Sequence, residues 1–255
     1  MITAGKVIST IEAGVATITF SHPQSNSLPG ELLRSLAASI SEHGSNSAVK
    51  VIVIKSEGDK TFCAGASFDE LISITTLEEG RIFFSGFAMV INAIRLAPKF
   101  VIARIQGKAV GGGVGVAAAA DYAIAHTSAD VKLSELAVGI GPFVVGPAVE
   151  RKIGKSAFGT LSINATAWHP AQWAHEKGLF SEVHDDLESV DNSVAKLASR
   201  LSGSSPEAMK QLKSVLWEGT SHWETLLPER AEMSGTLVLT DHAKNAISRF
   251  KQGTR

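Results

Sequence analysis

The sequence has few of the features that mark secreted, metal-binding or strongly charged proteins. One cysteine, Cys63, among 255 residues excludes an intramolecular disulfide and indicates a reducing compartment. Cysteine and histidine do not cluster at metal-ligand spacing, so no metal site is predicted. A formal net charge of -1 gives no electrostatic reason to expect a nucleic acid as a partner.

Long apolar runs are also missing, and none is long enough to span a bilayer. Lys6 and Glu12 interrupt the apolar residues near the N-terminus, which is not typical of a signal peptide. Residues 253–255 do not form a peroxisomal address. We therefore expect a cytoplasmic protein with no membrane partner.

Short β-branched runs alternate with helical patterns in the first part of the chain. The run 51–54 is continuously apolar, as expected of a strand that is buried on both faces. Alternation of this kind predicts an α/β fold with parallel strand pairing. The predicted strands are 7–10, 15–20, 51–55, 100–105 and 122–126, and the predicted helices here are 31–42 and 77–94.

Helical periodicity dominates from about Leu187 onward. We expect residues 1–190 to form an α/β core and residues 191–255 to form a helical segment that covers the core or joins subunits. Trp168 and Trp173 are expected to pack between helices. The C-terminal helices are predicted at 189–201, 206–217, 222–239 and 242–250.

The segment 107–115 contains three consecutive glycines between an apolar strand and the small helix formers 116–120. Glycine lets a backbone turn tightly and approach a ligand closely. The helix that follows points unpaired N–H groups and the positive end of its dipole at the turn. The segment is therefore suited to stabilising a developing negative charge, although close helix–strand packing would also explain the glycines.

A second turn, 62–70, follows the buried strand at 51–55 and exposes the backbone of Ala64, Gly65 and Ala66. Ser67 and Glu70 have the Ser-x-x-Glu spacing of a capping box, which predicts a helix start. Two backbone N–H groups from separate turns can converge on one oxygen and form an oxyanion hole. The two turns are therefore interpreted as a pair.

In combination, these motifs resemble the crotonase superfamily, the enoyl-CoA hydratase/isomerase family. The resemblance covers about three quarters of the chain, with the motifs in matching order and spacing. It rests on Asn26-Ser27-Leu28, Cys63-Ala64-Gly65-Ala66, the segment 107–113, Asp121, Glu135 with Gly139 and Pro142, and the segment 171–183.

The resemblance implies a spiral of ββα turns, an acyl-CoA thioester substrate and a homotrimer or dimer of trimers. It implies no cofactor, since coenzyme A is part of the substrate. Ala66 and Gly112 would donate the oxyanion N–H groups, and Asp121 would be structural. Residues implied at the substrate or CoA are Ala64, Gly65, Ser67, Phe68, Gly111, Phe143 and Lys251, of which Lys251 would approach CoA in a neighbouring subunit unless it lies on a fraying helix end.

One of the two glutamates that hydratases of this family carry is replaced by Gly115, which leaves Glu135. Hydration of a 2-enoyl thioester benefits from two acid–base groups, whereas moving a double bond needs one base that removes and returns a proton. The sequence therefore favours Δ3 to Δ2 enoyl-CoA isomerisation, with a pKa of Glu135 raised by apolar neighbours such as Leu136. Phe143 stands where a dienoyl-CoA isomerase would need an aspartate.

Other interpretations remain open at this level. Glu135 in isolation is better explained by a surface carboxylate or a structural ion pair, and only its position in the family motif favours a catalytic role. A hydratase or decarboxylase of the same superfamily is the nearest alternative. A protein that binds acyl-CoA without turnover is an alternative of another class, supported by the missing carboxylate at Gly115.

Overall fold

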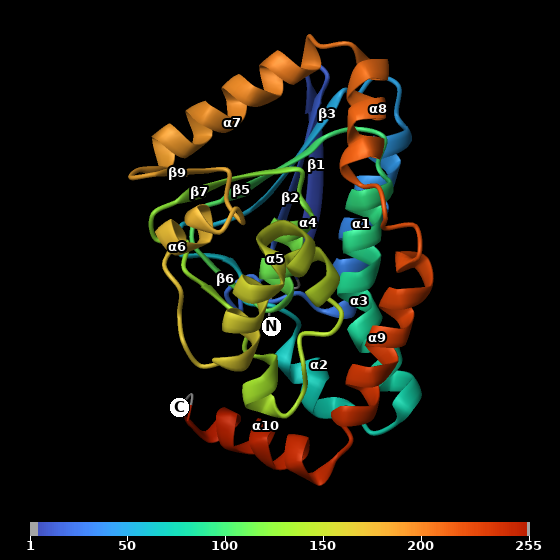
Figure 1. Cartoon of the computed structure of the whole chain (residues 1–255), viewed down its shortest axis with the longest axis vertical. Helices are drawn as coiled ribbons and strands as arrows, with labels where there is room; N and C mark the ends of the chain where they lie inside the picture. The colour runs from blue at the N-terminus through green and yellow to red at the C-terminus, as the bar shows by residue number, and fades with distance from the viewer. Residues whose placement is uncertain (1–4, 254–255) are drawn as a thin grey trace.

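A six-stranded and a three-stranded sheet form the centre of the molecule (Figure 1). The computed structural model describes residues 5–253, with side chains through residue 249. The large sheet has the order β1-β2-β3-β5-β7-β9 and the small sheet the order β4-β6-β8. The strands are β1 (Lys6–Glu12), β2 (Val15–Ser21), β3 (Val51–Ser56), β4 (Thr61–Cys63), β5 (Val101–Ile105), β6 (Lys108–Val110), β7 (Tyr122–His126), β8 (Val131–Lys132) and β9 (Glu182–His184).

Strand pairing follows the buried apolar runs of the sequence. β1 and β2 form an antiparallel hairpin through Ala13 and Gly14, which both have positive φ angles, as a tight hairpin turn requires. The pairs β2–β3, β3–β5, β5–β7 and β7–β9 are parallel. Residues 51–54 of β3 are all buried, since the sheet is covered on both faces. All five predicted strands are confirmed.

The small sheet gives the fold its spiral. β4 follows β3, β6 follows β5 and β8 follows β7, so successive passes of the chain add a strand to each sheet before turning into helix. This arrangement confirms the predicted α/β spiral of ββα units. The small strands were not predicted, because two or three residues carry too short a hydrophobic pattern.

The helices between the strands pack around this core. α1 (Gly30–Ser45) and α3 (Leu77–Leu96) are confirmed with slightly longer ends. α4 begins at Gly112 rather than after the glycines, so three glycines lie within a completely buried helix. The remaining elements before the C-terminal region are α2 (Phe68–Ser73), the 3-10 helix η1 (Glu135–Val138), α5 (Gly146–Ile163) and α6 (Ala171–Glu176).

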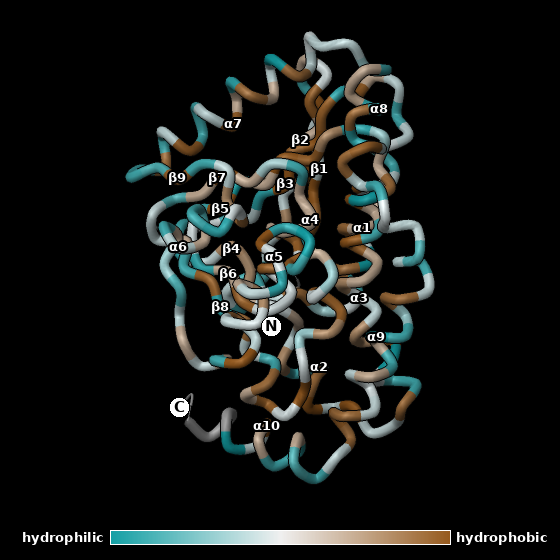
Figure 2. The backbone as a smooth tube through the Cα atoms, viewed as in Figure 1, coloured by the Kyte–Doolittle hydropathy of each residue, from teal (hydrophilic) through white to brown (hydrophobic). Residues whose placement is uncertain are grey.

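Four helices complete the chain: α7 (Leu187–Ser202), α8 (Pro206–Leu216), α9 (Trp223–Leu237) and α10 (Asp241–Gly253). α7 covers the outer face of the large sheet with its apolar residues. In Figure 2 apolar and polar residues alternate along this helix. α9 packs along α3, with a close contact between Gly80 and Gly235. α10 crosses below η1 and α2 in Figure 1, and Ala243 lies against Gly139. The four predicted helices are confirmed.

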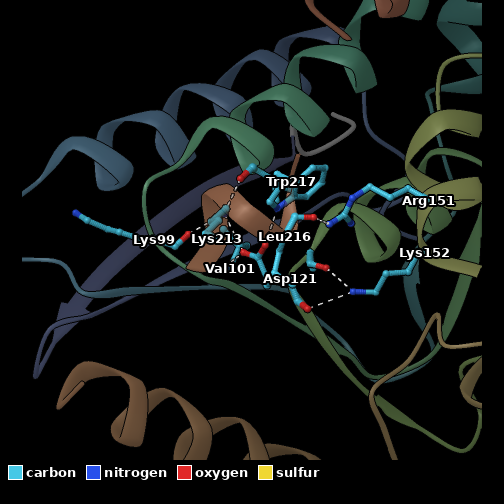
Figure 3. Close-up of polar contacts among 10 residues, drawn as sticks. Lys99, Val101, Asp121, Arg151, Lys152, Lys213, Leu216 and Trp217 are labelled. Atoms are coloured by element: carbon cyan, nitrogen blue, oxygen red, sulfur yellow. Dashed lines mark hydrogen bonds and ion pairs between the residues drawn. The ribbon is translucent and has the colours of Figure 1, made fainter. Parts of the chain in front are cut away.

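Asp121 attaches the C-terminal helices to the core (Figure 3). Its carboxylate accepts hydrogen bonds from the Val101 N–H at 2.7 Å and from Lys213 Nζ and Trp217 Nε1, each at 2.8 Å. Lys152 Nζ donates to the backbone oxygens of Ala120 and Asp121 at the end of α4. The structural role expected for Asp121 therefore includes the docking of α8 as well as the turn after α4.

None of the helices within residues 5–253 combines the length and apolar character of a bilayer crossing.

Candidate active site

A cavity of about 610 Å³ lies where the small sheet, α3, α4 and η1 meet. Both turns singled out in the sequence line it, through Ala64, Gly65, Ala66, Gly111 and Gly112. Glu135 lies in the same wall. Much of the remaining surface is apolar and comes from Phe83, Phe84, Phe87, Phe143, Val144 and Val145. The cavity thus combines a few polar groups with a large apolar surface, as small-molecule sites do.

The first turn points the N–H of Ala66 away from Leu28, its partner in an isolated parallel bridge. The backbone N–H of Leu28 donates to the carbonyl oxygen of Gly65 at 2.8 Å, and the carbonyl oxygen of Leu28 accepts from the Ser67 N–H at 3.1 Å. In such a parallel bridge the central residue, here Ala66, directs its own N–H to the opposite side. Since Ala66 lines the cavity, that N–H is available to a ligand.

A strained loop holds this turn in place. Ser25 and Asn26 have φ angles of 54° and 56°, a region that asparagine tolerates better than most residues. The Asn26 side chain donates to the Glu57 oxygen at 2.9 Å and the Thr61 oxygen at 2.8 Å. The Ser25 oxygen then accepts from the Ala64 N–H at 3.2 Å. The sequence placed Asn26 in a family motif but did not reveal this positioning role.

The second turn brings the start of α4 to the same place. Gly111 has a φ of 52°, and its N–H donates to the Lys132 oxygen at 2.9 Å. Gly112 is the first residue of α4, so its N–H has no acceptor within the helix. A Cβ built on Gly65 would lie 3.9 Å from the Gly112 nitrogen, which shows how closely the two turns approach. Their convergence is the geometry that an oxyanion hole needs.

Glu135 lies beside this pair of donors. Its Oε2 is buried and has no hydrogen-bond partner among the described residues, although the residue as a whole is only half-buried. A Cβ on Gly111 would meet Oε1 at 2.8 Å, so the carboxyl group rests directly on the second turn. Burial raises the pKa of Glu135 to about 7, while its own backbone N–H acts weakly in the opposite direction.

This environment argues against the two alternative roles of Glu135, a surface carboxylate and a structural ion pair. The buried, unpartnered Oε2 is not that of a surface carboxylate, and Glu135 makes no ion pair within residues 5–253. Leu136 does not contribute the expected apolar cover, because it is 51% exposed. Leu133 is buried and Val138 lines the cavity. A carboxyl group with a pKa near neutrality is well matched to accepting and returning a proton.

Position 115 is closed to any side chain. A Cβ on Gly115 would lie 2.5 Å from Val145 Cγ1 and 2.9 Å from Val145 Cβ. Val145 also lines the cavity, so it contributes apolar surface beside the place where a carboxylate is missing. The cavity therefore has one buried carboxyl group, that of Glu135, a second and exposed one at Asp69, and an apolar wall near Gly115.

We expect Gly115→Ala to destabilise the protein by about 1–3 kcal/mol, because the added methyl group overpacks against Val145. In a Val145→Gly background both clashing atoms are gone and Ile91 Cδ1 at 3.6 Å is the next side-chain contact, so the same substitution should cost little or increase stability, since alanine favours helix over glycine. The free energies of unfolding of the four proteins, measured in urea, give the coupling energy. An equal cost in both backgrounds would contradict this packing.

Two expected site residues, Ser67 and Lys251, differ from the rest. Ser67 is 4% exposed and does not line the cavity; its Oγ accepts from the Glu70 N–H at 3.3 Å at the start of α2. Only this half of the predicted capping box forms, because the Glu70 carboxylate accepts from the Gly30 N–H instead. Phe68 and Phe143 both line the cavity. Lys251 belongs to α10, but its side chain lies outside the described residues.

Cys63 has a structural role at the first turn. It is fully buried, and burial raises the pKa of its thiol to about 12. Its Sγ accepts from the Gly65 N–H at 3.4 Å. A protonated, buried thiol is not a nucleophile, so Cys63 is not a catalytic residue. Lys132 and Val145 also line the cavity but were not identified from the sequence. Their neighbours in the cavity come from segments that are distant in the chain, so no local pattern indicates them.

The two-sheet spiral with a cavity between two converging backbone turns is the architecture of crotonase-fold proteins. An enoyl-CoA hydratase from Bacillus halodurans superposes with a TM-score of 0.88 at 22% identity, covering 95% of this chain and 99% of that one. The enoyl-CoA hydratase/isomerase family model matches residues 10–253. The chain belongs to the enoyl-CoA hydratase/isomerase family, within the crotonase superfamily.

Similar proteins include bacterial and mitochondrial enzymes, and the bacterial one below is matched over nearly its full length. The short-chain-enoyl-CoA hydratase of Clostridium acetobutylicum is 29% identical over 247 residues, covering 96% of this chain and 94% of the relative. The mitochondrial methylglutaconyl-CoA hydratase of Homo sapiens is 33% identical over 198 residues, covering 76% of this chain and 58% of the relative. The protein is thus an enzyme of the family that acts on acyl-CoA thioesters.

Proposed function

We propose that the protein isomerises 3-enoyl-CoA thioesters to 2-enoyl-CoA thioesters, with Glu135 as the single proton shuttle. The observation that carries this proposal is the pairing of one buried carboxyl group, whose pKa is about 7, with a packed apolar residue where a second carboxylate would stand. A hydratase gains from two acid–base groups, whereas an isomerase needs one group that both removes and returns a proton.

The proposed reaction uses the three groups in turn. The N–H groups of Ala66 and Gly112 donate to the thioester oxygen and stabilise the negative charge that develops there. The Glu135 carboxylate removes a proton from C2, and the C3–C4 double-bond electrons become part of a dienolate. Glu135 then returns the proton to C4, which leaves a double bond between C2 and C3. The proton and the electron pair balance without a cofactor.

Backbone donors are suited to this role because they are already fixed. The Ala66 N–H is set by the bridge to Leu28, and the Gly112 N–H is set by the start of α4. Loss of one such donor typically costs about 3 kcal/mol of transition-state stabilisation. The dipole of α4 adds to the stabilisation, since its positive end points at the same oxygen.

The test is turnover of a 3-enoyl-CoA and a 2-enoyl-CoA of equal chain length, followed by the absorbance of the conjugated thioester. Rising absorbance with the 3-enoyl substrate and little change with the 2-enoyl substrate are expected. Rapid loss of absorbance with the 2-enoyl substrate would instead establish a hydratase. Binding of both thioesters without turnover would establish a non-catalytic acyl-CoA-binding protein.

Hydration is the second candidate because the relatives with full-length matches bear hydratase names. In that case a water molecule would be activated by Glu135 alone, and its addition across C2 and C3 would need no group at Gly115. Decarboxylation remains a third possibility of the same superfamily. The homotrimer or dimer of trimers, the cytoplasmic location and the division at residue 190 remain predictions.

A further inference from the structure

Two lysines and a tryptophan form a cluster on one face of the small sheet. Lys132 of β8 is paired with Val110 of β6, and Lys108 lies two residues before Val110 on the same face. The antiparallel bridge between Val131 and His169 brings Trp168 alongside. Lys132 Nζ is 4.3 Å and Lys108 Nζ is 4.7 Å from the centroid of the Trp168 ring.

The two ammonium groups are not neutralised by protein carboxylates. Neither makes an ion pair among the described residues, and Asp130, two positions before Lys132, pairs with neither. Burial, and secondarily the charge of Lys108, lower the pKa of Lys132. Holding two like charges around one indole is unfavourable in the absence of a counter-charge.

Trp168 is 40% exposed and does not pack between helices as the sequence suggested. Trp173, by comparison, is half-buried with its ring 4.5 Å from that of His169. The Trp168 ring partly compensates the lysine charges through cation–π contacts, which also keep both ammonium groups close together. The indole Nε1 makes no hydrogen bond with the described residues. The cluster thus offers several donors facing solvent.

The cluster is continuous with the active-site cavity. Lys132 and Val110 both line the cavity, and Glu135 follows Lys132 by three residues in the same wall. A ligand that fills the cavity therefore passes within reach of the Lys132 side chain. Its charge is the one lysine charge among the cavity-lining residues of the described chain.

We propose that Lys108, Lys132 and Trp168 form a binding subsite for an anionic oxygen-bearing group of the substrate that occupies the cavity. The inference rests on the proposed function in taking an acyl-CoA thioester as that substrate. Two sources carry this chemistry: a phosphate of coenzyme A, or a carboxylate on the acyl chain. Either would relieve the repulsion between the lysines and bind through charge-assisted hydrogen bonds.

The test is a comparison of binding between ligands that differ only in the anionic group. Dissociation constants are measured by calorimetry for two matched pairs, CoA with 3′-dephospho-CoA and 4′-phosphopantetheine with pantetheine. A second series uses acyl-pantetheines with a terminal carboxylate or a terminal methyl group. In the wild-type protein we expect the anionic member of one series to bind about tenfold more tightly, equivalent to 1.4 kcal/mol.

The double variant Lys108→Gln/Lys132→Gln should reduce that ratio to about one, because the neutral amides keep the length of the chain without its charge. Lys210→Gln, which removes an exposed lysine from α8, is the matched control and should leave the ratio unchanged. Collapse of the ratio in the CoA series assigns the subsite to phosphate, and collapse in the acyl series assigns it to a carboxylate.

An unchanged ratio in both series of the double variant would overturn the proposal. Equal weakening of anionic and neutral ligands would also overturn it, because that result indicates general damage to the cavity. The measurement is independent of turnover, so a protein that binds these ligands but converts none would contradict the isomerase proposal alone. Failure of both CoA and pantetheine to bind would contradict the acyl-CoA site itself.

Discussion

We expect Glu135→Gln to lower kcat for 3-enoyl-CoA by about 10⁴-fold while the dissociation constant of the thioester changes little, since glutamine keeps the shape of the side chain but cannot accept the proton. Turnover is measured by conjugated-thioester absorbance and binding by calorimetry. Val144→Ala, which trims the apolar wall without touching the carboxyl group, should alter KM far more than it lowers kcat. Undiminished turnover of Glu135→Gln would remove Glu135 from the mechanism.

The pH dependence of the wild-type enzyme follows from the same group. Because Glu135 must be ionised to remove a proton, kcat/KM should fall tenfold per pH unit below its pKa of about 7 and level off above it. The residual activity of Glu135→Gln should lack this limb. A limb centred near pH 4.5, the ordinary value for glutamate, would indicate that the carboxyl group is not desolvated as the structure describes.

As the pH rises, the stability of the wild-type protein should fall while its activity increases. The folded state raises the pKa of Glu135 from 4.5 to about 7, so it retains a proton that the unfolded chain has already released. The resulting decrease in the free energy of unfolding is absent below pH 4.5, grows between pH 4.5 and 7, and is complete above pH 7. Glu135→Gln should therefore be more stable than wild type by roughly 3 kcal/mol at pH 8 and equal to it at pH 4.

Asp121→Ala is expected to destabilise the protein by about 3–5 kcal/mol, because it leaves the Lys213 charge buried without a counter-charge. The side chains of Asp121 and Lys213 are 5% and 3% exposed, so water cannot replace the lost carboxylate. The Val101 N–H and Trp217 Nε1 lose their acceptor as well. Urea denaturation at pH 7 measures the loss.

The deficit of Asp121→Ala should shrink as the pH rises. Burial already lowers the pKa of Lys213, and Asp121 opposes that shift, so removal of Asp121 lowers the pKa further. The folded variant then sheds the proton before the unfolded chain does, and stability increases with pH between the two pKa values. As a control, Glu57→Ala removes the exposed Lys6–Glu57 pair and should cost less than about 1 kcal/mol. Equal losses in both variants would argue against a buried anchor.

Local patterns were enough to predict most of the secondary structure. Residues 51–54 are apolar without interruption, and all four are buried in β3. The helix patterns in the last quarter of the chain are regular, and α7 to α10 lie within a few residues of the predicted positions. The strands β4, β6 and β8 escaped prediction because they exist through pairing with one another, and pairing partners are distant in the sequence.

Sequence by itself determined which groups are present: two glycine-containing turns, one carboxylate at Glu135 and none at position 115. Only the tertiary structure decided what those groups can do. The pKa of Glu135 depends on desolvation by folded neighbours, and the closeness of Gly65 to Gly112 depends on two sheets wound together. Val145 beside Gly115 and Lys132 beside Lys108 are likewise products of packing. Composition and local periodicity carry no information on distances between separate segments, and electrostatic and steric energies depend on those distances.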